Sequence, residues 1–384
     1  MRVSYVSRGL FLAGSLLASF AAMPAGAATE KVIYSFKGGY DGAVPVAGVL
    51  KLGKSFYGTT YSGGGTGCSG VGCGTVFSVT TAGKETVLHT FGEGVDGARP
   101  LSVLLNFDGM LYGTTQDGGD TNAGTVFSIT PDGAHTVLHS FGSGADGVEP
   151  FAGLINVDGT FYGTTIGGGP DFNGTVFFIK PTGQEKVLYS FNANESGYPF
   201  AALLQKGKSL YGTTGRGGGG GVFKVAIKSG KEKVLHSFKA GTTEASFPYA
   251  SLINVGGTFY GTTFGGGSGD CGGGQHCGTV FTVTPDGKEQ ELYSFKGGSD
   301  GANPYAALLN VNGTLYGTTQ AAGSGGRGTV FKITTTGVET VVHAFGGANG
   351  ANPQGTLIEA NGKLYGTTTA GGAYGEGTVF ELTP

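Results

Sequence analysis

Residues 159–177 read GTFYGTTIGGGPDFNGTVF, and two phrases in this stretch, YGTT and GTVF, recur along the chain. YGTT begins at Tyr57, Tyr112, Tyr162, Tyr211, Tyr260, Tyr316 and Tyr365, at intervals of 49 to 56 residues. GTVF begins at Gly74, Gly124, Gly174, Gly278, Gly328 and Gly377, and a variant, GGVF, ends at Phe223. A third phrase, of which TVLHSF is one form, ends at Phe36, Phe91, Phe141, Phe191, Phe238, Phe295 and Phe345. Three phrases in fixed order, repeated seven times, indicate a repeat architecture.

Each repeat contains four short runs with β-strand character. In the repeat that starts at residue 300 these runs are YAALLNV, TLYGTT, TVFKIT and ETVVHAF, separated by an NG turn, a Gly-rich loop and a TG turn. Such runs between such turns indicate antiparallel hairpins. Four antiparallel strands in about 50 residues are typical of a propeller blade, and the kelch period is the closest known one. A Gly-rich β-helix is the alternative, but its coils repeat at much shorter intervals.

The two ends of the chain complement each other. After residue 27 the chain begins with EKVIYSF, which corresponds to the fourth strand of a blade, and it stops at GTVFELTP, which corresponds to the third. If the first strand completes the last blade, the ring closes and no strand edge stays unpaired. The sequence therefore predicts an all-β fold for residues 28–384. We expect a single closed seven-bladed β-propeller of four-stranded antiparallel blades.

The tandem unit LYGTT–GG–GTVF–TPxG–VLHSF resembles the GloVer-type repeat of exported bacterial proteins, and the resemblance covers essentially all of the chain after residue 27. The resemblance implies an exported, repetitive protein with a β-propeller fold. It supplies no activity, cofactor or site residue that carries over to this chain.

The first 27 residues have the pattern of a secretory signal peptide. Arg2 and Arg8 form a basic region ahead of an apolar stretch at residues 10–23. Ala25-Gly26-Ala27 is an A-x-A cleavage site. The apolar stretch, about 14 residues long, is shorter than the roughly 20 residues of a membrane span. We therefore expect cleavage near Ala27, no membrane insertion, and a secreted or periplasmic protein.

The composition excludes several other classes of protein. Glycine accounts for 80 residues but does not fall on every third position, which excludes collagen. The chain has 26 Phe, 17 Tyr and only 13% charged residues, unlike a disordered protein. Cleavage of the leader removes two of 23 basic residues, which leaves 21 against 26 acidic ones, a net charge near −5. This balance argues against nucleic acid as a partner.

Four cysteines form two close pairs, Cys68 with Cys73 and Cys271 with Cys277, within the two longest repeat intervals. In an oxidising compartment each pair predicts a local disulfide. A zinc site is the alternative, because His276 adjoins the second pair. The spacers of four and five residues differ from the two-residue spacing that zinc prefers, so we favour disulfides and predict no metal site.

The DGxxP loops and the long GTTxxGG loops are expected to share one face of the ring, which makes it the candidate binding face. The residue after each of these prolines is Val46, Leu101, Phe151, Phe200, Tyr249, Tyr305 or Gln354. Its four aromatic members lie on consecutive blades and predict a collar at the channel mouth. Together with Tyr61 and Phe264, which follow GTT, the collar suits stacking on sugar rings, and packing between blades is the alternative.

Polar residues on the same face are further candidates. Gln320 follows GTT, and Arg216 lies in the run GRGGGGG, where it is either a partner for a carboxylate ligand or a solvated loop charge. The DGxxP loops also carry single carboxylates, Asp41, Asp96, Asp146 and Asp300, with Asn349 in the last copy. These suit an Asx-turn before the strand, which we favour, or a calcium ion. We accordingly predict no cofactor, with calcium as the alternative.

No catalytic motif stands out. The chain has no GxSxG elbow after a helix, no HExxH, no P-loop and no EF-hand spacing. Four histidines occupy a repeated slot before the last Phe of TVLHSF that Tyr fills in the other repeats, which indicates a structural role: His89, His139, His236 and His343. Of the other two, His135 is expected in a turn and His276 lies between cysteines.

Three functions stay open. The first is a binding module for an extracellular glycan or protein partner, the second a propeller-type polysaccharide lyase or lactonase, and the third a structural scaffold. The uniform repeats favour the first and third and argue against an enzyme. The fourth and fifth blades depart most from the pattern, so we expect any unique site near Arg216, Tyr249 and Phe264. We expect a monomer.

Overall fold

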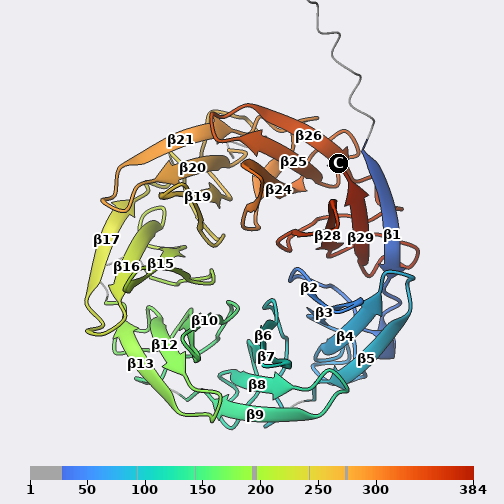
Figure 1. Cartoon of the computed structure of the whole chain (residues 1–384), viewed down its shortest axis with the longest axis vertical. Helices are drawn as coiled ribbons and strands as arrows, with labels where there is room; N and C mark the ends of the chain where they lie inside the picture. Colours follow the sequence, from blue (N-terminus) through green and yellow to red (C-terminus); the bar gives the residue numbers. More distant parts are fainter. Residues whose placement is uncertain (1–27, 93, 143, 193–196, 242, 273–275) are drawn as a thin grey trace, which may run out of the picture.

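The computed structural model describes residues 28–92, 94–142, 144–192, 197–241, 243–272 and 276–384. These residues form seven antiparallel sheets arranged as a closed ring (Figure 1), so the predicted fold class is confirmed. The proposed signal peptide, residues 1–27, lies outside the described residues. We number the blades by their strands: 50–90 (blade 1), 105–140 (2), 155–190 (3), 204–237 (4), 253–294 (5), 302–344 (6), and 358–383 with 29–35 (7).

All blades have the same strand order from axis to rim. The inner strands are β2 (Leu50–Leu52), β6 (Leu105–Phe107), β10 (Ile155–Val157), β14 (Leu204–Lys206), β18 (Ile253–Val255), β23 (Leu309–Val311) and β27 (Ile358–Ala360). The second strands are β3 (Ser55–Thr60), β7 (Met110–Thr115), β11 (Thr160–Thr165), β15 (Ser209–Thr214), β19 (Thr258–Thr263), β24 (Thr314–Ala321) and β28 (Lys363–Thr368).

The third strands carry GTVF and the outer strands carry the TVLHSF phrase. The third strands are β4 (Thr75–Thr80), β8 (Thr125–Ile129), β12 (Thr175–Ile179), β16 (Gly221–Ala226), β20 (Thr279–Val283), β25 (Thr329–Thr334) and β29 (Thr378–Thr383). The outer strands are β5 (Glu85–Thr90), β9 (His135–Ser140), β13 (Glu185–Ser190), β17 (Glu232–Ser237), β21 (Glu289–Ser294), β26 (Glu339–Ala344) and β1 (Thr29–Ser35). A fifth strand in blade 6, β22 (Ala302–Pro304), pairs with β24, and η1 (Gly39–Asp41) is a single 3-10 turn.

The ring closes through the two ends of the chain. β1 pairs antiparallel with β29, from Thr29 opposite Thr383 to Ser35 opposite Thr378. The N–H of Val44 also donates a 2.9 Å hydrogen bond to the carbonyl of Glu376. The first strand therefore completes blade 7 as its outer strand, as the sequence predicts (Figure 1).

The inner strands are shorter than the sequence predicts. Of the seven-residue run 305–311, only Leu309–Val311 forms a strand. The residues before it lie at the axis, where segments of different blades come too close for larger side chains. A Cβ added at Gly48, for example, would lie 2.2 Å from the carbonyl oxygen of Thr356 in the adjacent blade. These small residues pack against neighbouring blades, and they do not extend the sheet.

The glycine of GTVF is required by the next blade. At every blade boundary a Cβ on this glycine would lie 2.5 to 2.8 Å from the Cδ of the DGxxP proline, as between Gly124 and Pro150 or Gly377 and Pro45. The same glycines have φ between 85° and 100°, a region that favours glycine. The GTVF phrase of one blade and the proline loop of the next blade therefore meet at each blade boundary.

The threonines of YGTT hold the sheets together in two ways. In six blades the first threonine donates to a backbone carbonyl of the next blade, as from Thr114 Oγ1 to Ala152 O at 3.1 Å. In six blades the second shares a hydrogen bond with the threonine of GTVF in its own blade, as between Thr115 and Thr125 at 2.8 Å. The intervening packing is supplied by buried Phe side chains, which form apolar clusters shared by adjacent blades.

Both predicted disulfides are present. Cys68 bonds to Cys73 in the β3–β4 loop, and Cys271 bonds to Cys277 in the β19–β20 loop, so the alternative of a zinc site on these cysteines is wrong. Two disulfides indicate an oxidising extracellular or periplasmic compartment. The residues that the structure describes include no helix with the length and apolar character needed to cross a bilayer.

Candidate functional site: the channel mouth

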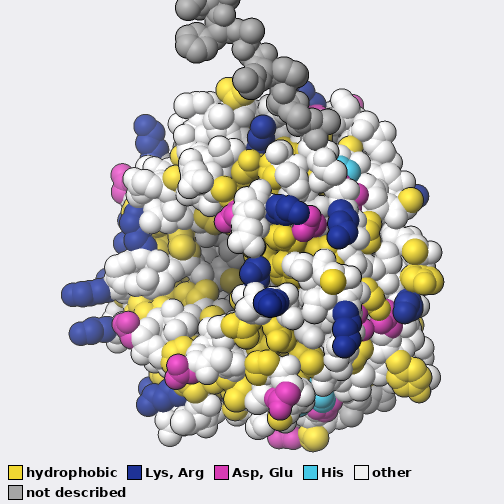
Figure 2. Space-filling view, turned by 45° about the vertical axis from the view of Figure 1, so that its right-hand side comes forward, with side chains coloured by type: hydrophobic (Ala, Val, Ile, Leu, Met, Phe, Trp, Pro, Cys, Tyr) yellow, Lys and Arg dark blue, Asp and Glu magenta, His cyan; other side chains and the backbone are white. Residues whose placement is uncertain are grey.

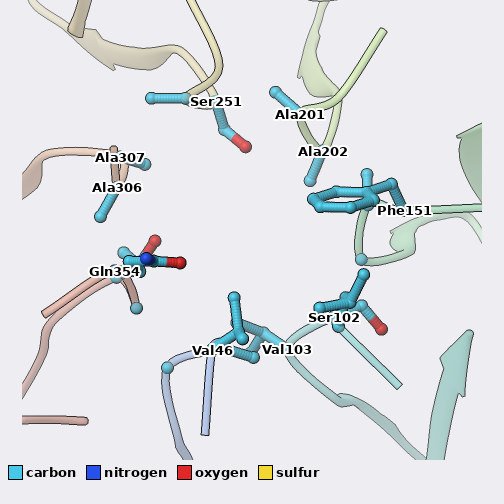
Figure 3. Close-up of a pocket in the computed structure, with 18 of the residues that line it drawn as sticks. Val46, Ser102, Val103, Phe151, Ala201, Ala202, Ser251, Ala306, Ala307 and Gln354 are labelled. Carbon is cyan, nitrogen blue, oxygen red and sulfur yellow. The ribbon is translucent and has the colours of Figure 1, made fainter. Parts of the chain in front are cut away.

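The residues that follow the repeated proline of the seven blades meet around the axis of the ring. They line an open cavity of about 340 Å³ together with the small residues that come next in each blade. Val46, Phe151 and Gln354 point into this opening from three different blades, with Ala202, Ser251 and Ala307 between them (Figure 3). On the molecular surface the ring shows a hollow bordered by hydrophobic side chains (Figure 2). The predicted residues thus come together, although they lie about 50 positions apart in the chain.

Four aromatic residues from consecutive blades form one side of the opening. Phe151, Phe200, Tyr249 and Tyr305, here called the aromatic arc, have successive ring centroids 5.5, 5.1 and 5.7 Å apart. The other side consists of Val46, Leu101 and Gln354. The arrangement is therefore a half-ring, and the opening has an aromatic wall facing an aliphatic and polar one.

Phe264 extends the arc at blade 5. Its ring centroid lies 5.8 Å from that of Tyr249 and 6.3 Å from that of Tyr305. Gly215 takes the corresponding position after GTT in blade 4, and a Cβ there would lie 2.7 Å from the ring of Phe200 and 2.8 Å from that of Tyr249. Glycine at this position lets the two rings approach each other, so the fourth and fifth blades build the densest part of the arc.

The residue just before each DGxxP proline has a positive φ, which the sequence reasoning missed. All seven lie between 56° and 60°: Val44, Arg99, Glu149, Tyr198, Phe247, Asn303 and Asn352. Non-glycine residues rarely adopt this conformation. The N–H of each donates to a carbonyl of the preceding blade, as from Glu149 to Ala123 at 2.8 Å. The detectable signal is a variable residue at a fixed place before an invariably repeated proline.

These pre-proline residues contact several of the predicted site residues. Phe247 stacks on Tyr249 with centroids 6.2 Å apart and thereby joins the arc. The guanidinium of Arg216 lies 4.4 Å from the ring centre of Tyr198, a cation–π contact. Asn303 donates from Nδ2 to the carbonyl of Phe264 at 2.9 Å. Arg216 is therefore exposed and contacts an aromatic face.

Tyr61 and Gln320 lie outside the arc. Tyr61 is covered by Arg99, whose guanidinium is 5.6 Å from the ring centre and pairs with Asp117 at 2.9 Å. Gln320 is half-buried in β24, at the blade 6 position that corresponds to Phe264 in blade 5. Neither belongs to the described residues that line the opening.

The opening carries no formal charge on the residues described around it. Burial, with a smaller contribution from Tyr249, raises the pKa of Tyr305 to about 12. Burial also raises the pKa of Tyr249, against the opposing effect of Arg216. Both hydroxyls are therefore protonated at neutral pH and available for hydrogen bonds. The lyase or lactonase hypothesis predicts clustered His or carboxylate side chains at this mouth, and the described lining residues include no His, Asp, Glu, Lys or Arg.

A second polar region lies at the rim, between the outer strands. In five blades the repeated His or Tyr of the outer strand forms a hydrogen bond with the Asp or Asn of the loop that follows, as where Tyr293 donates to Asp300 at 2.8 Å. The Asp side chain also accepts a backbone N–H group from four residues earlier, as Asp146 does from Gly142 at 2.7 Å. This bond closes the loop after the outer strand and differs from the predicted Asx-turn, in which the side chain accepts from the N–H two residues later. His135 is not in a turn as predicted: it is the first residue of β9, because pairing with Ile129 extends the strand back to it.

The first residue of six outer-strand phrases is glutamate, and sequence reasoning missed this slot. It is occupied by Glu30, Glu85, Glu185, Glu232, Glu289 and Glu339, and by His135 in blade 2. The signal was a repeated acidic residue ahead of VLHSF. Its partners could not be read from one repeat, because they belong to the preceding blade.

Comparison of the sequence with known families gives a specific result. The profile of the Gloeobacter/Verrucomicrobia repeat matches residues 18–157, 65–275 and 215–384. The chain belongs to this family. The resemblance seen in the repeated phrases is thereby confirmed, and no curated protein matches the chain.

Solved structures share the fold at low sequence identity. A candidate 6-phosphogluconolactonase from Bacteroides fragilis NCTC 9343 has a TM-score of 0.50 and 18% identity, covering 83% of this chain and 87% of its own. A second candidate, from Bacteroides uniformis ATCC 8492, has a TM-score of 0.50 and 15% identity, over 78% of this chain and 84% of its own. A puromycin-hydrolyzing peptidase from Mycobacterium tuberculosis has a TM-score of 0.53 and 12% identity, over 87% of this chain but 52% of its own. These similarities concern the fold alone.

Proposed function

We propose that this member of the Gloeobacter/Verrucomicrobia repeat family is an exported binding module that holds a glycan at the channel mouth. The aromatic arc carries the proposal: four aromatic side chains from consecutive blades line one side of an open cavity of about 340 Å³. Cavities of a few hundred Å³ with mostly apolar walls and a few polar groups are the usual form of small-ligand sites.

The chemistry of the wall favours a neutral, ring-shaped ligand with hydroxyl groups. Aromatic faces bury the apolar C–H face of a sugar, and Tyr keeps a polar handle at its edge. The hydroxyls of Tyr249 and Tyr305 and the amide of Gln354 supply hydrogen-bond donors and acceptors around the opening. An uncharged wall offers little to a phosphate or a carboxylate, so anionic ligands are disfavoured at the mouth itself.

The compartment agrees with such a ligand. Two disulfides fit an oxidising environment outside the cytoplasm, where extracellular polysaccharides are found. We propose that the signal peptide at residues 1–27 directs export of the protein and is cleaved near Ala27. We propose that the mature protein acts as a monomer. An extracellular protein partner is the alternative occupant of the same face.

A glycan array and polysaccharide pull-down with purified protein test the proposal, each with and without calcium. Tyr249→Ala and Tyr305→Ala should each weaken binding of a captured glycan about tenfold or more. Tyr40→Ala is the matched control, because Tyr40 is 78% exposed in η1 and does not line the opening. Equal binding by all three variants would contradict the proposal. Thermal unfolding of each variant shows whether weaker binding comes from the missing aromatic side chain or from an unfolded protein.

The same samples distinguish the alternatives. Absorbance of unsaturated sugars, followed during incubation with polysaccharide, reports a lyase, and hydrolysis of a lactone substrate reports a lactonase. Turnover that survives Tyr249→Ala would place an activity away from the arc. Absence of both binding and turnover would favour the scaffold, with a protein partner as the next ligand to seek.

A further inference from the structure

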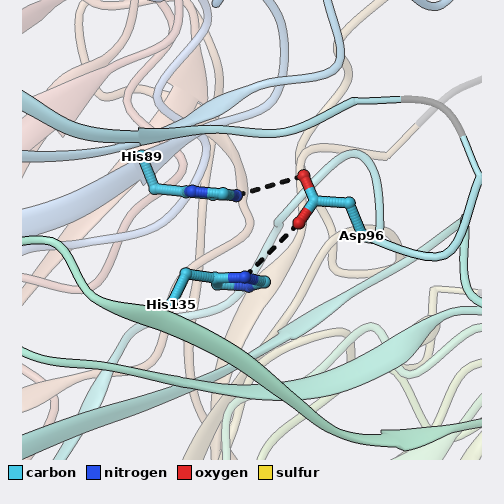
Figure 4. Close-up of side chains that lie close together, drawn as sticks. All are labelled: His89, Asp96 and His135. Carbon is cyan, nitrogen blue, oxygen red and sulfur yellow. Dashed lines mark hydrogen bonds and ion pairs between the residues drawn. The ribbon is translucent and has the colours of Figure 1, made fainter.

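Three metal-ligating side chains meet on the rim between blades 1 and 2 (Figure 4). His89 lies on β5, Asp96 in the loop that follows, and His135 on β9. Asp96 bridges the edges of the two stacked rings: its Oδ2 is 3.1 Å from His89 Nε2 and its Oδ1 is 3.3 Å from His135 Nδ1 (Figure 4). The three candidate ligand atoms all lie within 4.8 Å of one another.

This boundary departs from the pattern that the chain otherwise repeats. The slot of His135 holds glutamate in the six other blades. The next boundary, between blades 2 and 3, has one imidazole and two carboxylates, from His139, Asp146 and Glu185. Two imidazoles and a carboxylate therefore occur together because one repeat carries a substitution, and a unique site is expected where a repeat is broken.

The cluster is enclosed but reachable from solvent. The His135 side chain is 9% exposed, against 19% for His89 and 29% for Asp96. The rings of Phe91 and Phe127 pack on His135, with centroids 5.6 and 5.3 Å away. Among the described residues, the buried Nε2 of His135 has no hydrogen-bond partner. A polar nitrogen in that position costs free energy unless something satisfies it.

The three side chains have the donor types that a transition-metal ion prefers. Imidazole nitrogens and carboxylate oxygens are both zinc ligands in proteins. The carboxylate of Asp96 is held in place by the backbone N–H of Gly92, which donates to Oδ2 at 3.0 Å. One of the three ligands is thus already fixed by the backbone.

We propose that His89, Asp96 and His135 bind one divalent transition-metal ion, with Zn²⁺ the best match, and that the ion links blade 1 to blade 2. Two histidines with one carboxylate are a common protein ligand set for zinc, which leaves a fourth position for water. Calcium prefers oxygen ligands and is disfavoured here. The site does not depend on the function proposed for the channel mouth.

Metal binding must change the relative orientation of the two stacked imidazole rings. The imidazoles of His89 and His135 lie 4.0 Å apart and 9° from parallel. An ion about 2.0–2.1 Å from a nitrogen of each must lie near both ring planes. One ring therefore turns away from the other when the ion enters. A half-turn of the His135 ring about its Cβ–Cγ bond places Cδ2 where Nδ1 was and Nε2 where Cε1 was. Nε2, in place of Nδ1, then lies on the side of the ring that faces Asp96.

The test uses the full chain, produced without an affinity tag, stripped with a chelator and titrated with Zn²⁺ by calorimetry. We expect one ion per chain. The blade 7–blade 1 boundary has Tyr34, Asp41 and Glu85 at the corresponding positions. A double variant, His89→Tyr with His135→Glu, therefore carries a combination of residues that the chain already accommodates elsewhere. Zn²⁺ affinity should fall at least 100-fold in this double variant and at least tenfold in each single variant. His343→Tyr, at another boundary, should leave affinity unchanged.

Co²⁺ absorption gives a readout that stability does not influence. A Co²⁺ complex with two imidazoles should show visible bands in the parent chain that the double variant lacks. Failure of the parent to bind Zn²⁺, or equal binding by the double variant, would overturn the proposal. So would binding abolished by His276→Ala alone, since that would locate the ion at the disulfide loop, or calcium binding as tight as Zn²⁺ at this site.

Discussion

Glu185, on the outer strand of blade 3, shares a hydrogen bond with Asp146, which lies in the loop after the outer strand of blade 2. Burial, followed by the nearby charge of Asp146, raises the pKa of Glu185 to about 8. Two further boundaries have the same pairing, Asp41 with Glu85 and Asp300 with Glu339, where the glutamate pKa is raised to about 7. At neutral pH these carboxyl pairs hold protons between adjacent blades.

The first prediction concerns the dependence of stability on pH. The pKa of an unfolded glutamate is near 4.5, so Glu185 binds more protons in the folded protein than in the unfolded chain between about pH 4.5 and pH 8. The contribution of Glu185 to the free energy of unfolding should therefore fall as pH rises through this window. Glu185→Gln keeps the hydrogen bond without the charge, and should raise Tm at pH 8.5 by about 1–3 °C. The gain is small because solvent screens a partly exposed group.

Thermal unfolding by circular dichroism from pH 4 to pH 9 measures this effect. At pH 4 the parent and Glu185→Gln should unfold at nearly the same temperature, because the carboxyl is then protonated in both states. Glu359→Gln, on the exposed side of β27, serves as the control and should follow the parent at every pH. A Glu185→Gln profile parallel to that of the parent would argue against a shared proton.

The fold was predictable because each repeated phrase has a physical partner that recurs with it. The Gly of GTVF needs the proline of the next blade, as Gly124 needs Pro150, so neither phrase varies freely. The offset between the ends predicted the pairing of β1 with β29. The aromatic arc was also foreseeable, because a fixed position after each proline must point at the axis once the ring closes.

Contacts between repeats were harder to predict. Read one loop at a time, Asp146 is a lone carboxylate in a turn, and only the ring brings Glu185 of the next blade against it. Arg216 and Tyr198 likewise lie in two loops, 18 positions apart in the sequence, and their contact depends on how these two loops fold. His135 was assigned to the turn, because strand ends depend on pairing partners that periodicity does not reveal.

The second prediction concerns ring closure. A Cβ at Gly377 would lie 2.3 Å from Thr368 O and 2.6 Å from Pro45 Cδ, at a φ of 100°. Gly377→Ala should therefore lower the free energy of unfolding by about 3 kcal/mol or more, the sum of backbone strain and overpacking. Gly375→Ala is the matched control: its φ is 86°, but nothing lies within 4 Å of the added Cβ. It should cost only about 1 kcal/mol. Urea denaturation compares the two, and equal losses would rule out the contact with Pro45 as the cause.

The third prediction concerns the disulfide loops. Each loop closes only a few residues, so its loss should cost about 2 kcal/mol in loop entropy. Cys68→Ala with Cys73→Ala should therefore lower Tm by a few degrees while the β-sheet spectrum stays intact. The Cys271–Cys277 pair should cost about as much, because Cys73 and Cys277 are both fully buried in clusters shared by adjacent blades. Unfolding of either variant at 25 °C would show that the loops do more than stiffen the long-loop face.

The last prediction concerns the blade whose GTVF phrase reads GGVF. In the six other blades the second Thr of YGTT shares a 2.7 to 2.8 Å hydrogen bond with the Thr of GTVF. Gly221 takes that position in blade 4, and the buried hydroxyl of Thr214 has no partner there among the described residues. Gly221 is not among the residues with positive φ, so Gly221→Thr fits the backbone and should stabilise the protein by about 1 kcal/mol through the restored bond.

Replacing a strand glycine also favours the sheet by itself, so the hydrogen bond must be separated from propensity. Gly221→Val has the same branching without the hydroxyl and supplies that reference. Combining each substitution with Thr214→Val completes a double-mutant cycle measured by urea denaturation. Gly221→Thr should exceed Gly221→Val in the parent, and the advantage should vanish or reverse once Thr214 is Val. If Val stabilises as much as Thr in the parent, the unpaired hydroxyl of Thr214 costs the blade nothing, and the threonine pairs of the other blades contribute through packing alone.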